Sequence, residues 1–213
     1  MGLSYEISVI GVHKYQMKIA WIFHIAISKQ ILRMKLFMIL IGCKPKNRRT
    51  EQHDIFFGIG NELRDFIEPI KDFWPDADGK IHIDAYRIVN KIGEYEITVI
   101  EKNDSTTSDT ELKLFFVNLG GYKPNEFDEF HYKELIVAPN LAKATEKAKR
   151  TVFWKHHTTA HIDDKYGLDV DDIYEIEDLL LDVDKEKYHI QIVPKIGLKE
   201  DVVANGYFKL SAL

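Results

Sequence analysis

Two short polar motifs each occur twice in this sequence, and each motif places its polar members two residues apart. The motifs are Glu-x-His and His-x-Asp, and their members are Glu51, His53, His82 and Asp84 in the first half and Glu129, His131, His161 and Asp163 in the second. Side chains at positions i and i+2 of a β-strand lie on one face, about 7 Å apart at the backbone. If the two strands are neighbours, each half gathers two imidazoles and two carboxylates.

Such a set of donor atoms fits two kinds of chemistry. It suits zinc, manganese or iron, or a histidine that a carboxylate polarises for general-base catalysis. The catalytic candidates are His53, His82, Asp84, His131, His161 and Asp163, and Glu51 and Glu129 join them as candidate metal ligands. The competing interpretation is structural, because a His-x-Asp pair at a strand end is often only a satisfied polar pair. The sequence points to no cofactor other than a divalent metal.

No complete catalytic motif accompanies these residues. The sequence contains no Gly-x-Gly-x-x-Gly, no phosphate loop, no Gly-x-Ser-x-Gly and no His-Glu-x-x-His. Its single cysteine, Cys43, excludes a disulfide framework within the chain. We therefore expect a non-enzymatic module that binds a small ligand or another protein. The alternative is a small metal-assisted or His/Asp acid-base enzyme.

The strands that would position these residues are also duplicated. At an offset of 78 residues, Lys35-Leu36-Phe37 matches Lys113-Leu114-Phe115, and further identities follow at Gly42, Asn47, Glu51 and His53. Offsets of 79 and 80 residues align the two His-x-Asp motifs and the two Phe-Trp pairs, Phe73-Trp74 and Phe153-Trp154. Self-similarity at a fixed offset is the mark of a repeated structural unit.

Hydrophobic periodicity gives each copy a β-β-α-β-β order. In the first copy we expect strands at 35–41, 52–58, 80–89 and 94–100, and in the second copy at 113–119 and 130–138. The helix between them starts at Asn61 in the first copy, where Pro69 should kink or divide it, and at Asn140 in the second. In the second helix, Leu141, Ala144, Ala148 and Val152 should face inward. The predicted fold is α+β: two tandem repeats in a pseudo-twofold body, with antiparallel sheets and helices on one face.

The repeat also sets the expected domain boundaries. They are an extension over 1–33, a first repeat over 34–101, a polar linker over 102–112, a second repeat over 113–180, and a C-terminal extension over 181–213. Within that last segment, 188–193 and 206–210 should form a short strand pair. Residues 1–33 differ in composition from the rest, so we interpret Met34 as the native start.

Charge and hydropathy narrow the classes of partner. The 213 residues carry 29 Lys and Arg against 34 Asp and Glu, a formal net charge of −5, and residues 34–213 alone carry −8. This balance disfavours nucleic acid, although the cationic stretch Lys44–Arg49 leaves phosphate or nucleic-acid binding as a third interpretation. No apolar run reaches the roughly 20 residues of a membrane span, and we expect a cytoplasmic protein. The oligomeric state is not encoded in any pattern here.

With these residues in view, the chain resembles a bacterial family labelled only as domain of unknown function 1543. The matching stretches are MKLFMILIGCKP from Met34, EQHDIFFGIG from Glu51, FWPDADGKIHID from Phe73, LFFVNLGGYKP from Leu114, EFHYKELIVA from Glu129 and HIDDKYGLDVDDIYEI from His161. The resemblance implies a duplicated α+β domain in a cytoplasmic bacterial protein, with no activity, substrate or cofactor assigned. It also implies that members begin near Met34.

Overall fold

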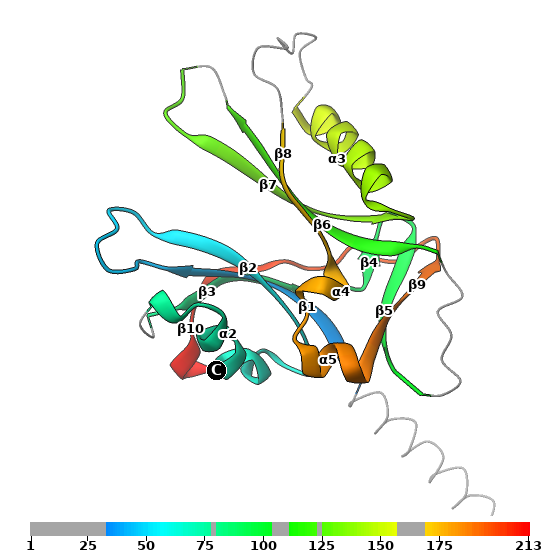
Figure 1. Cartoon of the computed structure of the whole chain (residues 1–213), viewed down its shortest axis with the longest axis horizontal. Helices are drawn as coiled ribbons and strands as arrows, with labels where there is room; N and C mark the ends of the chain where they lie inside the picture. The colour runs from blue at the N-terminus through cyan, green and yellow to red at the C-terminus, as the bar shows by residue number, and fades with distance from the viewer. Residues whose placement is uncertain (1–32, 78–79, 104–110, 123–124, 157–168) are drawn as a thin grey trace, which may run out of the picture. The chain divides into compact units, whose positions relative to one another are not determined.

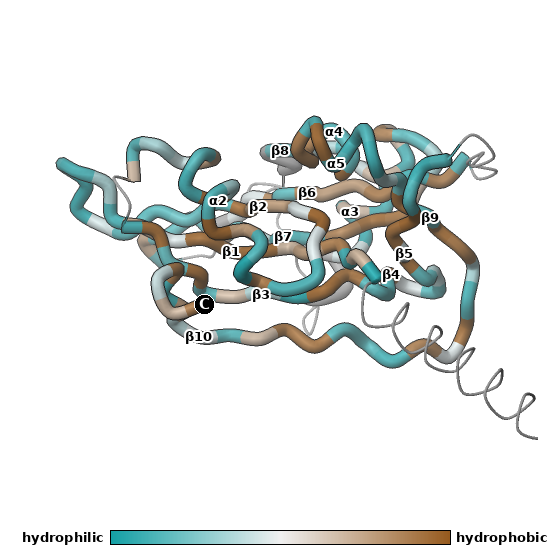
Figure 2. Tube along the Cα trace, turned by 90° about the horizontal axis from the view of Figure 1, so that it is seen from below, coloured by the Kyte–Doolittle hydropathy of each residue, from teal (hydrophilic) through white to brown (hydrophobic). Residues whose placement is uncertain are grey.

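The computed structural model describes residues 33–77, 80–103, 111–122, 125–156 and 169–213. The chain divides into two compact units, Met1–Met34 and Lys35–Leu213, and the description below concerns the second. Three antiparallel sheets and a few short helices build this unit (Figure 1). In Figure 2 the hydrophobic residues are concentrated along the strands, β1 and β5 among them. Among the described residues, no helix is long and apolar enough to cross a membrane. The combination of antiparallel sheets with separate helices confirms the α+β class.

Sheet A has four strands in the order β10-β3-β1-β2: β1 (Lys35–Cys43), β2 (Gln52–Gly60), β3 (His82–Ile88) and β10 (Ala204–Lys209). Alternate residues of β1 (Phe37, Ile39, Ile41 and Cys43) are buried against a short helical segment. That segment consists of the 3-10 helix η1 (Leu63–Phe66), α2 (Ile67–Phe73) and the 3-10 turn η2 (Pro75–Ala77). The helical segment thus covers one face of sheet A and leaves the other face, with Met38 and Leu40, for another layer.

Two predictions about this helical segment need comment. The helix is divided as expected, and Pro69 lies in the first turn of α2, where a missing N–H leaves no intrahelical bond unmade. Asn61 does not cap it. Glu62 is the N-cap residue of η1, and the Asp65 carboxylate accepts the backbone N–H groups of Asn61 and Glu62 at 2.8 and 3.1 Å.

Sheet C repeats this layering with strands in the order β7-β6-β8: β6 (Lys113–Tyr122), β7 (Glu129–Ala138) and β8 (Asp169–Glu175). The helix α3 (Leu141–His156) covers one face, and its Ala144 and Ala148 are fully buried against β6 and β7. Asn140 caps α3 as expected, because its Oδ1 accepts the N–H of Lys143 at 3.0 Å. Leu141, expected to face inward, is 52% exposed. Leu141 is the first residue of α3, and at this end the helix does not yet cover the sheet.

Sheet B joins distant parts of the unit. It pairs β4 (Lys91–Ile92), β5 (Tyr95–Glu101) and β9 (Tyr188–Pro194) in that order. The short helices α4 (Ile176–Leu179) and α5 (Asp182–Lys187) lead into β9, and the 3-10 turn η4 (Leu210–Ala212) follows β10.

The expected C-terminal strand pair is therefore wrong: β9 pairs with β5 and β10 pairs with β3. The first copy follows the expected β-β-α-β-β order along the chain, with the two-residue strand β4 added, but β5 belongs to sheet B and not to sheet A.

Sheets A and C share several details of register. The pair β1–β2 begins at Lys35 opposite Gly60, and the pair β6–β7 begins at Lys113 opposite Ala138, so both members are 78 residues further on. The ladder to the third strand shifts by one residue between Leu40 and Ile41 in sheet A, and between Asn118 and Leu119 in sheet C. Asn47 and Asn125, again 78 residues apart, both have left-handed backbone angles, with φ of 68° and 63°. Asparagine tolerates this conformation better than most residues.

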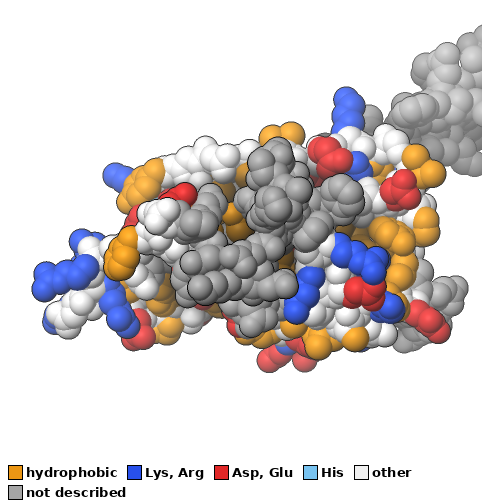
Figure 3. All heavy atoms as spheres, turned by 90° about the horizontal axis from the view of Figure 1, so that it is seen from above, with side chains coloured by type: hydrophobic (Ala, Val, Ile, Leu, Met, Phe, Trp, Pro, Cys, Tyr) orange, Lys and Arg blue, Asp and Glu red, His pale blue; other side chains and the backbone are white. Residues whose placement is uncertain are grey.

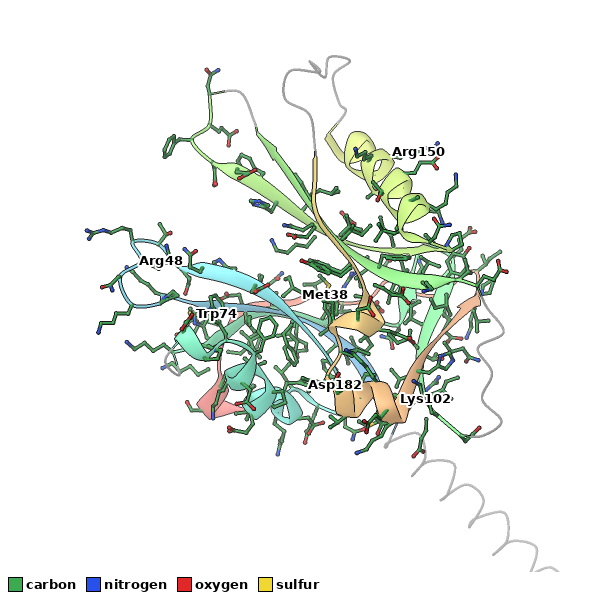
Figure 4. All side chains as sticks on the ribbon, in the orientation of Figure 1. Met38, Arg48, Trp74, Lys102, Arg150 and Asp182 are labelled. Atoms are coloured by element: carbon green, nitrogen blue, oxygen red, sulfur yellow. The ribbon has the colours of Figure 1, made fainter. Side chains whose placement is uncertain are left out.

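The faces of sheets A and C that are not covered by helices turn toward each other. Figure 1 shows α2 and α3 on the outer sides of the two sheets, and Figure 4 shows Met38 of β1 between them. Phe57 of β2 and Phe116 of β6 meet edge to face, with ring centroids 5.5 Å apart. A space that is partly open to solvent thus lies between the strands of the two halves.

Candidate functional site

Four of the eight predicted residues come together on the uncovered face of sheet A. Gly42 of β1 lies opposite His53 of β2 on one side and opposite His82 of β3 on the other. Asp84 is the residue of β3 without a partner on β1, since Leu40 pairs with Ala85 and Ile41 with Ile83. This extra residue allows Asp84 and the paired Ala85 to share a face with His82.

The side chains of Glu51, His53, His82 and Asp84 form a charge-paired cluster. His82 Nε2 lies 3.1 Å from Glu51 Oε1 and 3.2 Å from Asp84 Oδ1. His53 Nε2 lies 3.2 Å from Asp84 Oδ2 and 3.8 Å from Glu51 Oε2. Each carboxylate thus touches both imidazoles, which is the juxtaposition that the two i, i+2 motifs predict.

Burial differs sharply across the cluster. The side chain of His82 is 6% exposed and that of Asp84 25%, whereas those of His53 and Glu51 are 42% and 44% exposed. Asp84 Oδ2 is buried and accepts no hydrogen bond from the described residues, although His53 Nε2 is 3.2 Å away. That contact is electrostatic without hydrogen-bond geometry. The cluster therefore has a solvent-facing edge and a carboxylate oxygen that lacks a donor.

Gly42 makes room for this arrangement. A Cβ atom on Gly42 would lie 2.4 Å from Asp84 Oδ2, 2.9 Å from His82 Nε2 and 3.1 Å from His53 Cδ2. The first two distances are shorter than real Cβ contacts, so a side chain at position 42 would displace Asp84 and His82 from the cluster.

Tyr207 of β10 contributes an aromatic wall that the sequence reasoning missed. Its ring centroid lies 4.2 Å from that of His82, and the two planes are tilted by 34°. Tyr207 is itself 64% exposed. It fixes the orientation of a buried imidazole while keeping one side of its own ring in solvent.

The cluster brings two imidazoles and two carboxylates together on one face of sheet A. Within the residues that the structure describes, no group of three or more His, Cys, Asp or Glu side chains is arranged to hold a metal ion. The metal-ligand role of Glu51, His53, His82 and Asp84 thus stays a prediction. The nitrogen and oxygen atoms of the two imidazoles and the two carboxylates lie 3.1 to 3.8 Å apart, which is close enough for electrostatic contact.

In the second half the picture is different. Glu129 and His131 lie on β7, and His131 faces Gly120 just as His53 faces Gly42. Both residues are exposed, whereas His161 and Asp163 lie outside the described residues. On β8, Asp169 pairs with Gly120 as His82 pairs with Gly42 on β3. Asp171 is the unpaired residue of β8 and corresponds to Asp84. The expected alignment of His82-Ile83-Asp84 with His161-Ile162-Asp163 therefore does not match the strand register.

The cluster face continues along the strands into a pocket of about 320 Å³. The floor of this pocket is formed by Leu40, Ile55 and Ala85, which pair across the strands next to the cluster, and Met38 and Arg87 follow. Lys133 and Glu134 of β7 and Val203 of the segment before β10 complete the wall. The sequence reasoning also missed Arg87 and Lys133. Their strand positions were predicted, but nothing in the sequence shows that β7 faces sheet A.

The cationic stretch Lys44–Arg49 forms the exposed turn between β1 and β2. Figure 3 shows Lys and Arg side chains gathered at this end of the molecule, and Figure 4 labels Arg48 there. The turn projects away from the pocket-forming ends of the strands. Its phosphate-binding role stays a prediction.

Comparison with known proteins finds one family match and no activity. Residues 48–99 match the family model described as Domain of Unknown Function (DUF1543), the stretch that holds all four cluster residues. The resemblance stated from the sequence is thus confirmed there, for a single copy.

The fold is similar to that of a solved protein, Il1583 from Idiomarina loihiensis. The two chains share 19% identity, the match covers 83% of this chain and 98% of the other, and the TM-score is 0.56. None of the curated proteins matches this sequence significantly.

Proposed function

We propose that this chain is a non-enzymatic module that binds a small molecule on the uncovered face of sheet A. A hydrogen-bond donor of the ligand meets the cluster of Glu51, His53, His82 and Asp84, and the rest of the ligand occupies the adjoining pocket. The single observation that carries this proposal is the buried Asp84 Oδ2 without a donor. A buried polar atom without a partner costs about 1–3 kcal/mol, and an amine or hydroxyl of the ligand would relieve that cost.

Imidazole resonances provide a direct test. We expect small molecules from a fragment screen to shift the ring ¹⁵N signals of His53 and His82. His189 on β9 is the internal control, because it also lies near a carboxylate, Glu177, but belongs to sheet B. Fragments that bind the protein without shifting either cluster imidazole would contradict the proposal.

A second candidate function is an acid-base or metal-assisted enzyme. The observation that favours it is the shared contact of Asp84 with both imidazole Nε2 atoms. His53 is the half-exposed member, so it is the group that would exchange a proton with a substrate, while His82 and Asp84 hold it in place.

Elemental analysis separates the metal-assisted form from simple ligand binding. The protein is purified without a histidine tag, alongside a variant in which His53 and His82 are changed to Ala. Stoichiometric metal that disappears in the variant supports the metal-assisted enzyme. Metal-free wild-type protein, with the variant equally stable, argues against it.

The tandem duplication is part of the same proposal. It is supported by the shared offset of 78 residues in the strand registers and in the two left-handed asparagines. We propose repeats at 34–101 and 113–180, a linker at 102–112 between them, and extensions at 1–33 and 181–213. Antiparallel sheets with one helical layer each support the two-repeat interpretation.

We further propose a cytoplasmic location in a bacterium. The buried free thiol of Cys43 is compatible with a reducing compartment. A protease-protection assay on fractionated cells would check this location.

A further inference from the structure

Two cationic side chains, Arg87 and Lys133, line the pocket and have no ion-pair partner among the residues that the structure describes. Within the described part of the chain, neither Arg87 nor Lys133 has a carboxylate oxygen within 4.0 Å or donates a hydrogen bond. Burial lowers the pKa of Arg87, an effect that Asp201 and Glu134 oppose, and burial also lowers the pKa of Lys133, opposed by Asp54. Arg87 is half-buried and Lys133 is exposed, and no described carboxylate forms an ion pair with either of them.

Asp201 and Asp54, the acids that act on these two cations from outside the pocket, accept hydrogen bonds from other groups. The Asp201 carboxylate accepts hydrogen bonds from the backbone N–H groups of Asn90 and Lys91 at 2.9 and 3.2 Å, and from Asn90 Nδ2 at 3.1 Å. Asp54 is exposed and accepts the N–H of Ile55 at 2.7 Å. Glu134 lines the pocket itself and opposes the lowering of the pKa of Arg87.

A second pocket, of about 390 Å³, offers a useful contrast. Lys147 and Arg150 line it together with Tyr95 and Leu135. Lys147 Nζ donates to the Val137 carbonyl at 2.7 Å, and Arg150 pairs with Glu146 at 2.5 Å. Those cations have their partners within the protein. Among the described residues, the cations of the first pocket have none, and this difference favours the first pocket as the place where an anion would bind.

We infer that the ligand is a small organic carboxylate with an apolar body. Its carboxylate binds Arg87 with Lys133 alongside, and its body lies on Met38, Leu40 and Ile55. This inference rests on the proposed function, because the other end of the same ligand reaches the cluster. A guanidinium binds a carboxylate through two parallel hydrogen bonds. A planar carboxylate therefore suits Arg87 better than an anion that acts as a point charge. At about 320 Å³ the pocket is at the small end for ligand sites, so the ligand is small.

Three probes test the inference by calorimetry: hexanoate, its uncharged analogue hexanamide, and 6-aminohexanoate. We expect hexanoate to bind at least tenfold more tightly than hexanamide. Arg87→Gln should abolish this preference, and Arg87→Lys should retain part of it. Arg48→Gln, which removes an exposed arginine of the β1–β2 turn, should leave it unchanged. Thermal melts of each variant establish that it folds.

The outcomes distinguish the two proposals. Hexanoate that fails to bind, binds no better than hexanamide, or keeps its preference in folded Arg87→Gln overturns the carboxylate inference. If hexanoate behaves as expected but 6-aminohexanoate binds no more tightly, the carboxylate site stands and the cluster is not the donor-binding end. A gain from the amino group that disappears in His53→Ala supports both.

Discussion

Gly42 is the residue on which the cluster depends. It sits between two histidines from two neighbouring strands, and the carboxylate of Asp84 occupies the space that a side chain would need. The sequence predicted the four members of the cluster because their i, i+2 spacing fixes the face on which each side chain lies. It did not predict the stacking of Tyr207 on His82, because β10 follows β3 by more than a hundred residues and periodicity carries no information about that pairing.

Gly42→Ala should disrupt the cluster while the protein still folds. The new methyl group would force Asp84 and His82 apart, so we expect loss of ligand-induced shifts at His53 and His82 and a stability decrease of about 1–3 kcal/mol. Urea denaturation and the imidazole spectra measure both effects. Gly206→Ala is the control, because its Cβ would meet only the side chain of Phe208, at 3.2 Å. Equal losses in both variants would contradict the assigned role of Gly42.

Asp184 provides a pH-dependent prediction. It is 9% exposed, and burial raises its pKa, with the Ile59 N–H and Lys187 acting in the opposite direction. The folded state thus holds this proton more tightly than the unfolded state, so the contribution of Asp184 to stability is complete in acid. It is lost as the pH rises through the raised pKa.

Asp184→Asn removes this titration while keeping an acceptor for Ile59 N–H. We expect the variant to gain stability relative to wild type between about pH 4 and about pH 7. Urea midpoints across that range check the trend, and Asp182→Asn, at a 93% exposed side chain, should show no such trend. A stability difference that does not vary with pH would count against buried ionisation.

At the scale of elements, local signals determine where most strands and helices lie. The strands β1, β2, β6 and β7 begin within one residue of their predicted starts, because apolar runs ending at glycine or polar turns mark them clearly. Lys147 is not among the residues of α3 that were predicted to face inward, yet its Nζ donates to the Val137 carbonyl. A long side chain can bond to the sheet beneath its helix, and spacing alone does not reveal that choice.

Asn140→Ala tests the start of α3. Loss of the hydrogen bond from Lys143 N–H should destabilise the protein by about 1 kcal/mol, as is usual for an N-cap residue. Asn140→Asp should retain most of the stability, because aspartate caps equally well. Thermal denaturation measures both. No loss on Asn140→Ala would mean that packing of Ala144 and Ala148 alone determines where α3 begins.

At the scale of the whole molecule, the last two strands of the chain join the two halves, because β9 pairs with β5 and β10 pairs with β3. The sequence predicted β9 and β10 as a pair, since two short strands close in sequence usually form a hairpin. In the structure, Phe208 of β10 packs on Tyr86 with ring centroids 5.6 Å apart, and Leu210 joins the core of sheet A. The edges of β3 and β5 offered better partners than the neighbouring strand, and only the assembled sheets reveal those edges.

Ending the chain after Val203 should therefore weaken sheet A selectively. Without β10, the amides of β3 lose their partner strand, so we expect their hydrogen exchange to accelerate by at least tenfold. Amides of β6 and β7 in sheet C should exchange at nearly wild-type rates and act as the internal control. Uniform acceleration in both sheets would show that the unit opens as one cooperative body.

The pairing of β10 with β3 also has a consequence for the order in which the protein is made. Strands β6 to β8 of sheet C are complete when residue 175 has been synthesised, whereas sheet A waits for residue 209, although three of its strands are made first. The later half of the chain can thus complete its sheet on the ribosome while the earlier half still presents the open edge of β3. An unpaired edge is a site of aggregation during synthesis, so a nascent chain stalled before β10 is the form of this protein that most needs a chaperone.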